Sequence, residues 1–272
     1  AFGGNLTGFR LVNYFARNAD DILIGRFVGA QGLGYYTKAY KLLLAPIELI
    51  RRPISNVVIP SLSRLQDNPE RFRSYSMRAL SIIVFLSMPL TTFAFAEADR
   101  LVLFVLGPQW DQTAQIFRVL AAAAFVQSFN MVTGWSFTAL GQTDRFFKVG
   151  IFFALIVVSS FLIGIYWGAY GVAVAYTIAT YLVLPPTFWY CFQTSHLKTI
   201  DIIRSIWRPA IASISAAGLT FVLNIVASLE QILPLLLHIL VSGGTFISAY
   251  IGTWLILPGG AKFLLSLCNI TT

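Results

Sequence analysis

Charged residues interrupt the first long apolar stretch of this sequence. The segment RNADDILIGRFVG, residues 17–29, contains Arg17, Asp20 and Asp21 within a pattern that is otherwise typical of a membrane span. One charge near the bilayer centre costs about 2.5–3.5 kcal/mol on insertion scales, so such charges need partners or water. Two interpretations follow. Either carboxylate pairs with Arg17 three or four residues away, or one of them carries a coupling proton or holds Na⁺.

The next expected span, residues 36–60, carries a second charged stripe. At about 100° per residue, Lys41, Glu48 and Arg52 share one side of a helix, and Arg51 lies at the flank of that side. Charged stripes on two neighbouring helices indicate a water-filled cavity, because charges that faced lipid would stay unpaired.

Cations are in excess among the charges expected in this cavity. They are Arg10, Arg17, Lys41, Arg51 and Arg52. The carboxylates, which could pair with these cations or couple to an ion, are Asp20, Asp21 and Glu48. An excess of positive charge should attract an anion, and arginine favours bidentate contact with phosphate oxygens. We therefore expect these cations to bind a phosphate-bearing substrate.

Polar residues at helical spacing predict a neutral wall for the same cavity. Gln127, Asn130, Gly134 and Thr138 recur at i, i+3, i+7 and i+11 of an expected span, and Asn13 shares the charged side of the first span. The alternative is helix packing through small and polar residues, which the spacing supports equally well.

The sequence contains no convincing motif for a catalytic site or a metal site. His196 and His238 have no carboxylate or cysteine at metal-ligand spacing. The GAQGLG segment, residues 29–34, lacks the Gly-Lys-Ser/Thr ending of a phosphate loop and predicts a tight turn between helices. Cys191 and Cys268 are expected to be free thiols. We expect no catalytic residue, no metal and no cofactor.

Composition sets the fold class. Apolar residues make up 57% and charged residues 11% of the 272 residues, far from the soluble averages of about 45–50% and about 25%. Apolar blocks of about 20 residues predict an all-α, polytopic membrane helical bundle of about eight transmembrane helices rather than a barrel. The expected spans are about 4–27, 36–60, 77–95, 116–140, 146–166, 170–192, 209–229 and 233–257.

The basic residues of the joints are distributed unevenly. They gather in 61–78, 141–148, 194–208 and the tail, and they are few in the other joints. The positive-inside rule therefore places both chain ends in the cytoplasm, and it accounts for most of the net charge of +8 without a nucleic acid partner. Within the first basic joint, Asn68 as a cap and Pro69 as the first helical residue predict a short surface helix that leads into the third span.

Several motifs carry a family resemblance. They are Asp21, Gly25 and Arg26 at the end of the first span, Leu33, Gly34 and Tyr36 after it, the run Pro60 to Arg64, and the run Gly107 to Trp110. With the stretch ALGQTDRFFKVG they resemble the bacterial Wzx-type polysaccharide flippases of the multidrug/oligosaccharidyl-lipid/polysaccharide exporter superfamily. The resemblance is specific over about residues 13–150 and beyond that rests on the order of spans.

This resemblance implies an architecture and a function. Residues 1–193 would form the second transmembrane bundle, of six helices, and residues 194–272 would add two C-terminal transmembrane helices and a short cytoplasmic tail. The first bundle would be missing, so this part alone would not transport. The substrate would be an undecaprenyl-pyrophosphate-linked oligosaccharide, turned across the bacterial inner membrane for lipopolysaccharide or exopolysaccharide export and coupled to an ion gradient. The expected partners are that substrate, membrane lipids, the N-terminal bundle and the polysaccharide polymerase machinery.

Two alternatives remain open at this point. A membrane glycosyltransferase or polymerase of the same pathway would need a sizeable loop or domain outside the membrane, whereas the joints here do not exceed about 20 residues. A drug or ion exporter of the same superfamily would have an acidic or apolar cavity. The basic excess favours the sugar-lipid substrate, and we do not expect an enzyme.

Overall fold

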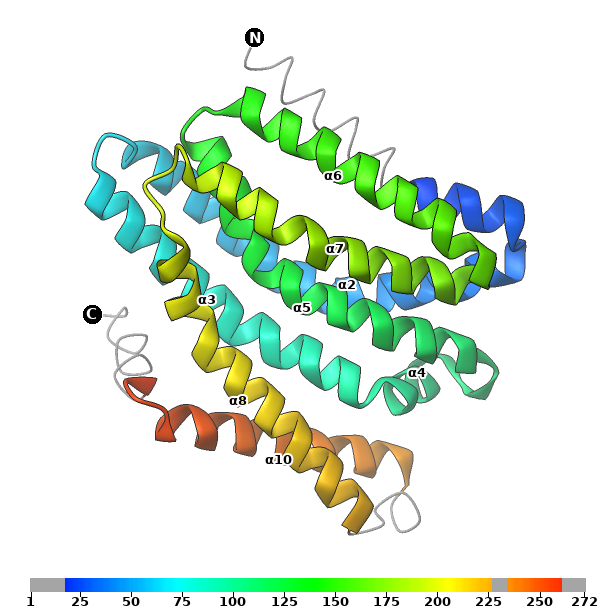
Figure 1. The fold of residues 1–272 in the computed structure, drawn as a ribbon. Coiled ribbons are helices and arrows are strands. Elements are labelled where there is room, and N and C mark those ends of the chain that lie inside the picture. The colour runs from blue at the N-terminus through cyan, green and yellow to red at the C-terminus, as the bar shows by residue number, and fades with distance from the viewer. Residues whose placement is uncertain (1–17, 227–233, 261–272) are drawn as a thin grey trace.

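A computed structural model describes residues 18–226 and 234–260 of the chain, and within these ranges the structure is helical without a β-strand. The α-helices that follow Gly29 pack against one another, and most of the long ones run diagonally in Figure 1. They are α2 (Ala30–Arg64), α3 (Pro69–Ala96), α4 (Ala98–Leu106), α5 (Asp111–Ala139), α6 (Thr143–Gly164), α7 (Gly168–Phe192), α8 (Thr199–Val226) and α10 (Leu235–Ile256). The described part of a preceding helix covers residues 18–27. The prediction of an all-α, polytopic bundle is confirmed.

The membrane-spanning segments follow the apolar blocks of the sequence. In the described ranges, five stretches are long and apolar enough to cross a membrane. They are Pro69–Ala96, Pro108–Ala139, Thr143–Phe192, Thr199–Ile225 and Leu235–Ile256. The third of them holds two helices, α6 and α7. Helix α2 is not in this set, because its charges lower its hydropathy. Its 35 residues, at about 1.5 Å each, nevertheless exceed the bilayer's hydrocarbon core of about 30 Å.

The first joint differs from its prediction. The turn lies at Val28 and Gly29, and residues 30–34 already belong to α2, so the predicted interhelical turn over 29–34 is wrong beyond its first residue. Gly29 has φ +95°, a left-handed conformation that glycine adopts without strain. One such residue is enough to reverse the chain, and Gly32 and Gly34 therefore continue in the helix.

The second joint confirms the predicted cap but not the predicted surface helix. Asn68 Oδ1 accepts a hydrogen bond from the Arg71 backbone N–H at 3.1 Å, and Pro69 is the first helical residue. Helix α3 then continues unbroken to Ala96. Its buried positions begin at Phe72 and recur with helical spacing through Leu80, so one packed face continues from the first turns into the apolar part of the helix and leaves no reason for a break.

Helix α5 is the centre of the bundle. It packs against α2, α3 and α7, and its buried residues join two apolar clusters. One cluster contains Tyr36, Leu120 and Phe161, and the other contains Leu80 and Trp135. Helix α8 packs along α3, and α10 packs along α8 through a smaller cluster. The division of the chain near residue 193 stays a prediction.

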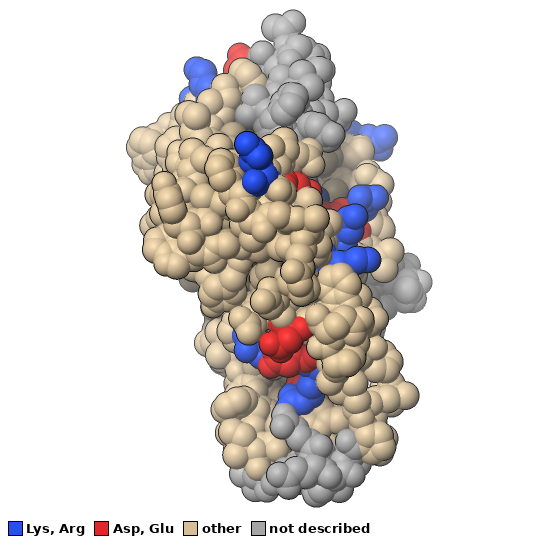
Figure 2. All heavy atoms as spheres, turned by 90° about the vertical axis from the view of Figure 1, so that its right-hand side faces the viewer, with Lys and Arg blue, Asp and Glu red and all other residues tan. Residues whose placement is uncertain are grey.

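The joints between helices gather at two ends. The basic joints, α2–α3, α5–α6 and α7–α8, lie together at the left of Figure 1. There the Arg73 Nε–H donates to Asp201 Oδ2 at 2.7 Å and ties α3 to α8. Figure 2 faces the other end, where acidic side chains lie beside basic ones. Ion pairs at that end join Arg118 to Asp99 and Arg100 to Glu97.

Candidate functional site

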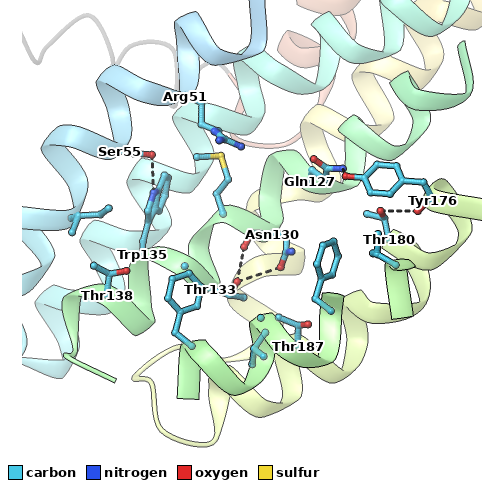
Figure 3. Close-up of a pocket in the computed structure, with 18 of the residues that line it drawn as sticks. Arg51, Ser55, Gln127, Asn130, Thr133, Trp135, Thr138, Tyr176, Thr180 and Thr187 are labelled. Atoms are coloured by element: carbon cyan, nitrogen blue, oxygen red, sulfur yellow. Dashed lines mark hydrogen bonds between the residues drawn. The ribbon is translucent and has the colours of Figure 1, made fainter. Parts of the chain in front are cut away.

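A cavity of about 620 Å³ lies between α2, α5, α6 and α7. Helix α5 supplies the polar wall, α6 supplies mostly apolar and aromatic residues, and α7 supplies hydroxyl groups (Figure 3). This volume is within the range of about 300–1,000 Å³ that is typical of ligand pockets. A polar cavity among apolar membrane helices needs water or a ligand, since unpaired polar groups in hydrocarbon are costly.

The residues of α5 that were expected as a polar wall line this cavity. Gln127, Asn130 and Thr138 lie on one face of α5, as their spacing requires (Figure 3). The Gln127 Nε2–H donates to the Tyr176 hydroxyl of α7 at 2.9 Å. Asn130 accepts hydrogen bonds from the Thr133 hydroxyl at its backbone oxygen, 2.8 Å, and at Oδ1, 3.3 Å. The contact to Tyr176 means that the wall also serves helix packing, and its role in binding stays a prediction.

Sequence reasoning missed several cavity residues. The Trp135 indole N–H donates to Ser55 Oγ at 3.0 Å and thereby joins α5 to α2. Thr180 and Thr187 line the α7 side. The spacing of Tyr176, Thr180 and Thr187, at i, i+4 and i+11, is a helical polar stripe like that of α5, and it was the available signal.

The cations expected at the cavity do not all reach it. Arg51 is half-buried and lines the cavity, and its Nη2–H donates to Glu48 Oε1 at 2.8 Å. Arg52 and Lys41 are exposed and lie outside the lining. The Arg52 Nε–H donates to the other Glu48 oxygen at 2.8 Å, so one carboxylate holds two arginines.

Helix geometry explains this separation. Lys41, Glu48 and Arg52 do share one side of α2, as expected, but Tyr36, Ala39, Leu43 and Ile47 set the packed side. At about 100° per residue the cavity meets the edge between these two sides, which is the flank that carries Arg51. The charged stripe itself is exposed on α2. Arg10, Asn13 and Arg17 lie outside the described residues.

The two aspartates of the first helix bond to α2. Asp20 is buried, lies at the cavity, and accepts a hydrogen bond from the Tyr36 hydroxyl at 2.8 Å. Asp21 accepts a hydrogen bond from the Thr37 hydroxyl at 3.3 Å. Both contacts cross the turn at Gly29, whereas the sequence analysis considered only cations as partners of these carboxylates. In the described ranges no cluster of three or more His, Cys, Asp or Glu side chains could hold a metal ion.

Comparisons with known proteins agree with the motifs. Residues 1–115 match the family described as "Polysaccharide biosynthesis protein". The chain is 24% identical over 234 residues to the lipopolysaccharide biosynthesis protein WzxC of Escherichia coli K12, which covers 83% of this chain and 46% of WzxC. It is 29% identical over 147 residues to the teichuronic acid biosynthesis protein TuaB of Bacillus subtilis 168, which covers 54% of this chain and 30% of TuaB.

A solved structure shares the helix arrangement. The lipid II flippase MurJ, in an inward closed conformation, superposes with a TM-score of 0.73 at 17% sequence identity, over 90% of this chain and 51% of MurJ. The chain shares the fold of MurJ over this region. The predicted resemblance to Wzx-type proteins is confirmed by the similarity to WzxC, and the several apolar helices of sufficient length indicate a multi-pass membrane protein. The glycosyltransferase alternative is not favoured, because the chain is similar to WzxC and TuaB and shares the fold of the flippase MurJ. The chain spans about half the length of WzxC and of MurJ.

Proposed function

We propose that this chain is one bundle of a flippase that turns a lipid-linked oligosaccharide across the bacterial inner membrane for surface polysaccharide synthesis. The observation that carries the proposal is the cavity between α2, α5, α6 and α7, because α5 and α7 line it with polar side chains although α5, α6 and α7 are otherwise apolar. A bundle that only held itself together would fill this space with apolar side chains. The similarity to WzxC and TuaB supports a polysaccharide pathway. The lipid carrier that fits the resemblance is undecaprenyl pyrophosphate.

The exposed cations of α2 are suited to bind the phosphates of the substrate. Lys41 and Arg52 are exposed on α2, a helix long enough to cross the membrane, and a charge there that faced acyl chains would be costly. WzxC and MurJ are about twice as long as this chain, which leaves room for another bundle opposite the stripe. We place a water-filled chamber between the two bundles, with the pyrophosphate held by Lys41, Arg51 and Arg52 and by Arg10 and Arg17 of the first span. The lipid tail would stay in the bilayer.

Carboxylates next to this chamber are suited to ion coupling. Asp20 is buried against the Tyr36 hydroxyl, and its protonation would change the contact between the first helix and α2. Asp21 and Glu48 are the further candidates. The basic joints at one end of the bundle support an orientation with that end, and with it both chain ends, in the cytoplasm. A polysaccharide polymerase would then meet the product at the opposite face.

The test is export by the full-length protein in cells that lack their own copy. Arg52→Ala and Arg17→Ala should each reduce surface polysaccharide and increase lipid-linked repeat units in the inner leaflet, with membrane insertion unchanged. Arg26→Ala, in an exposed position at the first joint, is the matched control and should export normally. Normal export by both stripe variants would reject the proposed role of these cations.

A further inference from the structure

The described wall of the cavity carries no net charge. Its charged lining residues in the described ranges are Asp20 and Arg51, which have opposite signs. The Arg51 guanidinium is also bonded to the Glu48 carboxylate at 2.8 Å. An anion that entered this cavity would therefore gain little net attraction from its described walls. The exposed stripe of α2, with Lys38, Lys41 and Arg52, offers the positive charge on the adjoining side of the helix.

Two amides in the wall have fixed orientations and unused hydrogen-bonding atoms. The Nε2 of Gln127 is engaged by Tyr176, and its Oε1 accepts no hydrogen bond from any described residue. The Oδ1 of Asn130 is engaged by Thr133, and its Nδ2 donates to no described residue. The two side chains are three residues apart on α5 and lie on neighbouring turns of one face. Together they present one acceptor and one donor group to a ligand.

Aromatic side chains line the same cavity as these amides. Trp135 is held by its hydrogen bond to Ser55, and Phe146 of α6 stacks on Phe137 with ring centroids 5.7 Å apart. Trp135 and Phe146 both line the cavity, and Trp135 is labelled in Figure 3. A pyranose ring has apolar C–H faces and a polar rim of hydroxyl groups. Aromatic faces beside one acceptor and one donor match those two surfaces, whereas a purely apolar drug would leave the amides unpaired.

We infer that this cavity binds an uncharged sugar unit, bearing hydroxyl or acetamido groups, while the anionic pyrophosphate stays outside it against the exposed stripe of α2. Gln127 Oε1 accepts from a sugar hydroxyl, and Asn130 Nδ2 donates to a hydroxyl or acetamido oxygen. The aromatic rings cover the C–H faces. The inference rests on the proposed function. It assigns the sugar to the neutral cavity and the phosphates to the cationic stripe of α2.

The experiment compares three ligands on the full-length protein in nanodiscs. They are undecaprenyl pyrophosphate, the same lipid carrying N-acetylglucosamine, and the same lipid carrying glucuronic acid. We expect the N-acetylglucosamine lipid to bind most tightly. Gln127→Ala and Asn130→Ala should each weaken its binding by about tenfold, as expected for the loss of one buried hydrogen bond, and should leave the bare lipid within about twofold of wild type. Gln115→Ala, an exposed glutamine on the same helix, is the matched control.

The outcomes separate the two claims. A wild-type protein that binds none of the three lipids contradicts the proposed function and the sugar subsite with it. Wild-type binding that is equal for bare and sugar-bearing lipid, or tighter for the glucuronic acid lipid, overturns the neutral subsite while the flippase proposal stands. Equal weakening of bare and sugar-bearing lipid in the alanine variants also overturns it. Trp135→Phe, which keeps an aromatic face, should retain the preference for the N-acetylglucosamine lipid.

Discussion

The Tyr36 hydroxyl donates a hydrogen bond to Asp20 Oδ2 at 2.8 Å, and both side chains are buried, with exposed fractions of 1% and 6%. The bond crosses the turn at Gly29 and joins the first helix to α2. With the contact between Asp21 and Thr37, it would transmit a change at the Asp20 carboxylate to the helix that carries Arg51 and the exposed cations.

Removal of the tyrosine hydroxyl should loosen this joint. Tyr36→Phe leaves the Asp20 carboxylate without its described side-chain donor, and an unsatisfied buried group costs about 1–3 kcal/mol. We expect a lower thermal unfolding temperature for the purified full-length protein, with an unchanged membrane location. Tyr75→Phe, a half-buried tyrosine outside the cavity, is a suitable control. An unfolding temperature equal to that of wild type would show that the hydrogen bond contributes nothing.

Replacement of Asp20 by asparagine should distinguish a structural role of this side chain from a role in ion coupling. Asp20→Asn keeps an oxygen that accepts from Tyr36 but cannot release a proton. We expect the variant to be stably folded and to have lost the dependence of transport on the ion gradient, measured as export before and after addition of an uncoupler. Export that stays fully sensitive to the uncoupler would assign Asp20 a structural role alone.

The backbone of the first turn should require glycine. Gly29 has φ +95°, and a Cβ added there would meet nothing within 4 Å, so Gly29→Ala would cost stability through backbone strain alone, about 1–2 kcal/mol. Gly34→Ala is matched to it, because it also meets open space but lies within α2 with no positive φ. Thermal unfolding in detergent should show a loss for the first and no loss for the second. Equal unfolding temperatures would contradict the strained turn.

A series of hydrogen bonds between polar side chains should hold the C-terminal helices in place. Glu97, 1% exposed, accepts from Asn224 Nδ2 at 2.9 Å, and Asn224 Oδ1 accepts from the Ser242 hydroxyl at 3.2 Å. Asn224→Asp would place a second carboxylate against Glu97. We expect a lower unfolding temperature at neutral pH that recovers partly at acidic pH, since protonation of one carboxyl removes the repulsion. A deficit that is the same at both pH values would rule out this repulsion as its cause.

The contact between α6 and α7 should tolerate no side chain at its closest point. A Cβ at Gly171 would lie 2.3 Å from the Gly164 backbone oxygen, so Gly171→Ala forces the two helices apart. We expect a marked loss of folded protein in membranes. Gly218→Ala on α8, where a Cβ meets nothing within 4 Å, should be expressed normally. Normal yield of the Gly171 variant, measured by fluorescence-detected size exclusion, would contradict this close approach.

Much of the architecture follows from short-range patterns. Apolar blocks of about 20 residues predicted α3, α5, α6, α7, α8 and α10, and the basic joints gather at one end as their alternation required. The spacing of Gln127, Asn130 and Thr138 predicted a shared face, because helical periodicity depends only on local geometry. The cap at Asn68 is local as well.

These local patterns could not predict contacts between residues that are far apart in the sequence. The side of α2 that meets the cavity depends on which residues pack against α5 and α7, so the spacing of Lys41, Arg51 and Arg52 could not select Arg51. The Tyr36 partner of Asp20 is 16 positions away and becomes a neighbour only because of the turn at Gly29. Trp135 and Ser55 are likewise brought together by helix packing.

The central claim is that the full-length protein moves a lipid-linked oligosaccharide between leaflets. The most direct measurement uses sealed proteoliposomes with a fluorescent undecaprenyl-pyrophosphate oligosaccharide placed in one leaflet, and follows the fraction that an added, membrane-impermeant glycosidase can reach. The account predicts that wild-type protein exposes the sugar of the other leaflet with time, faster under an imposed ion gradient, and that the Arg52→Ala variant is slower. An accessible fraction that stays equal to that of protein-free liposomes, with and without the gradient, would contradict it.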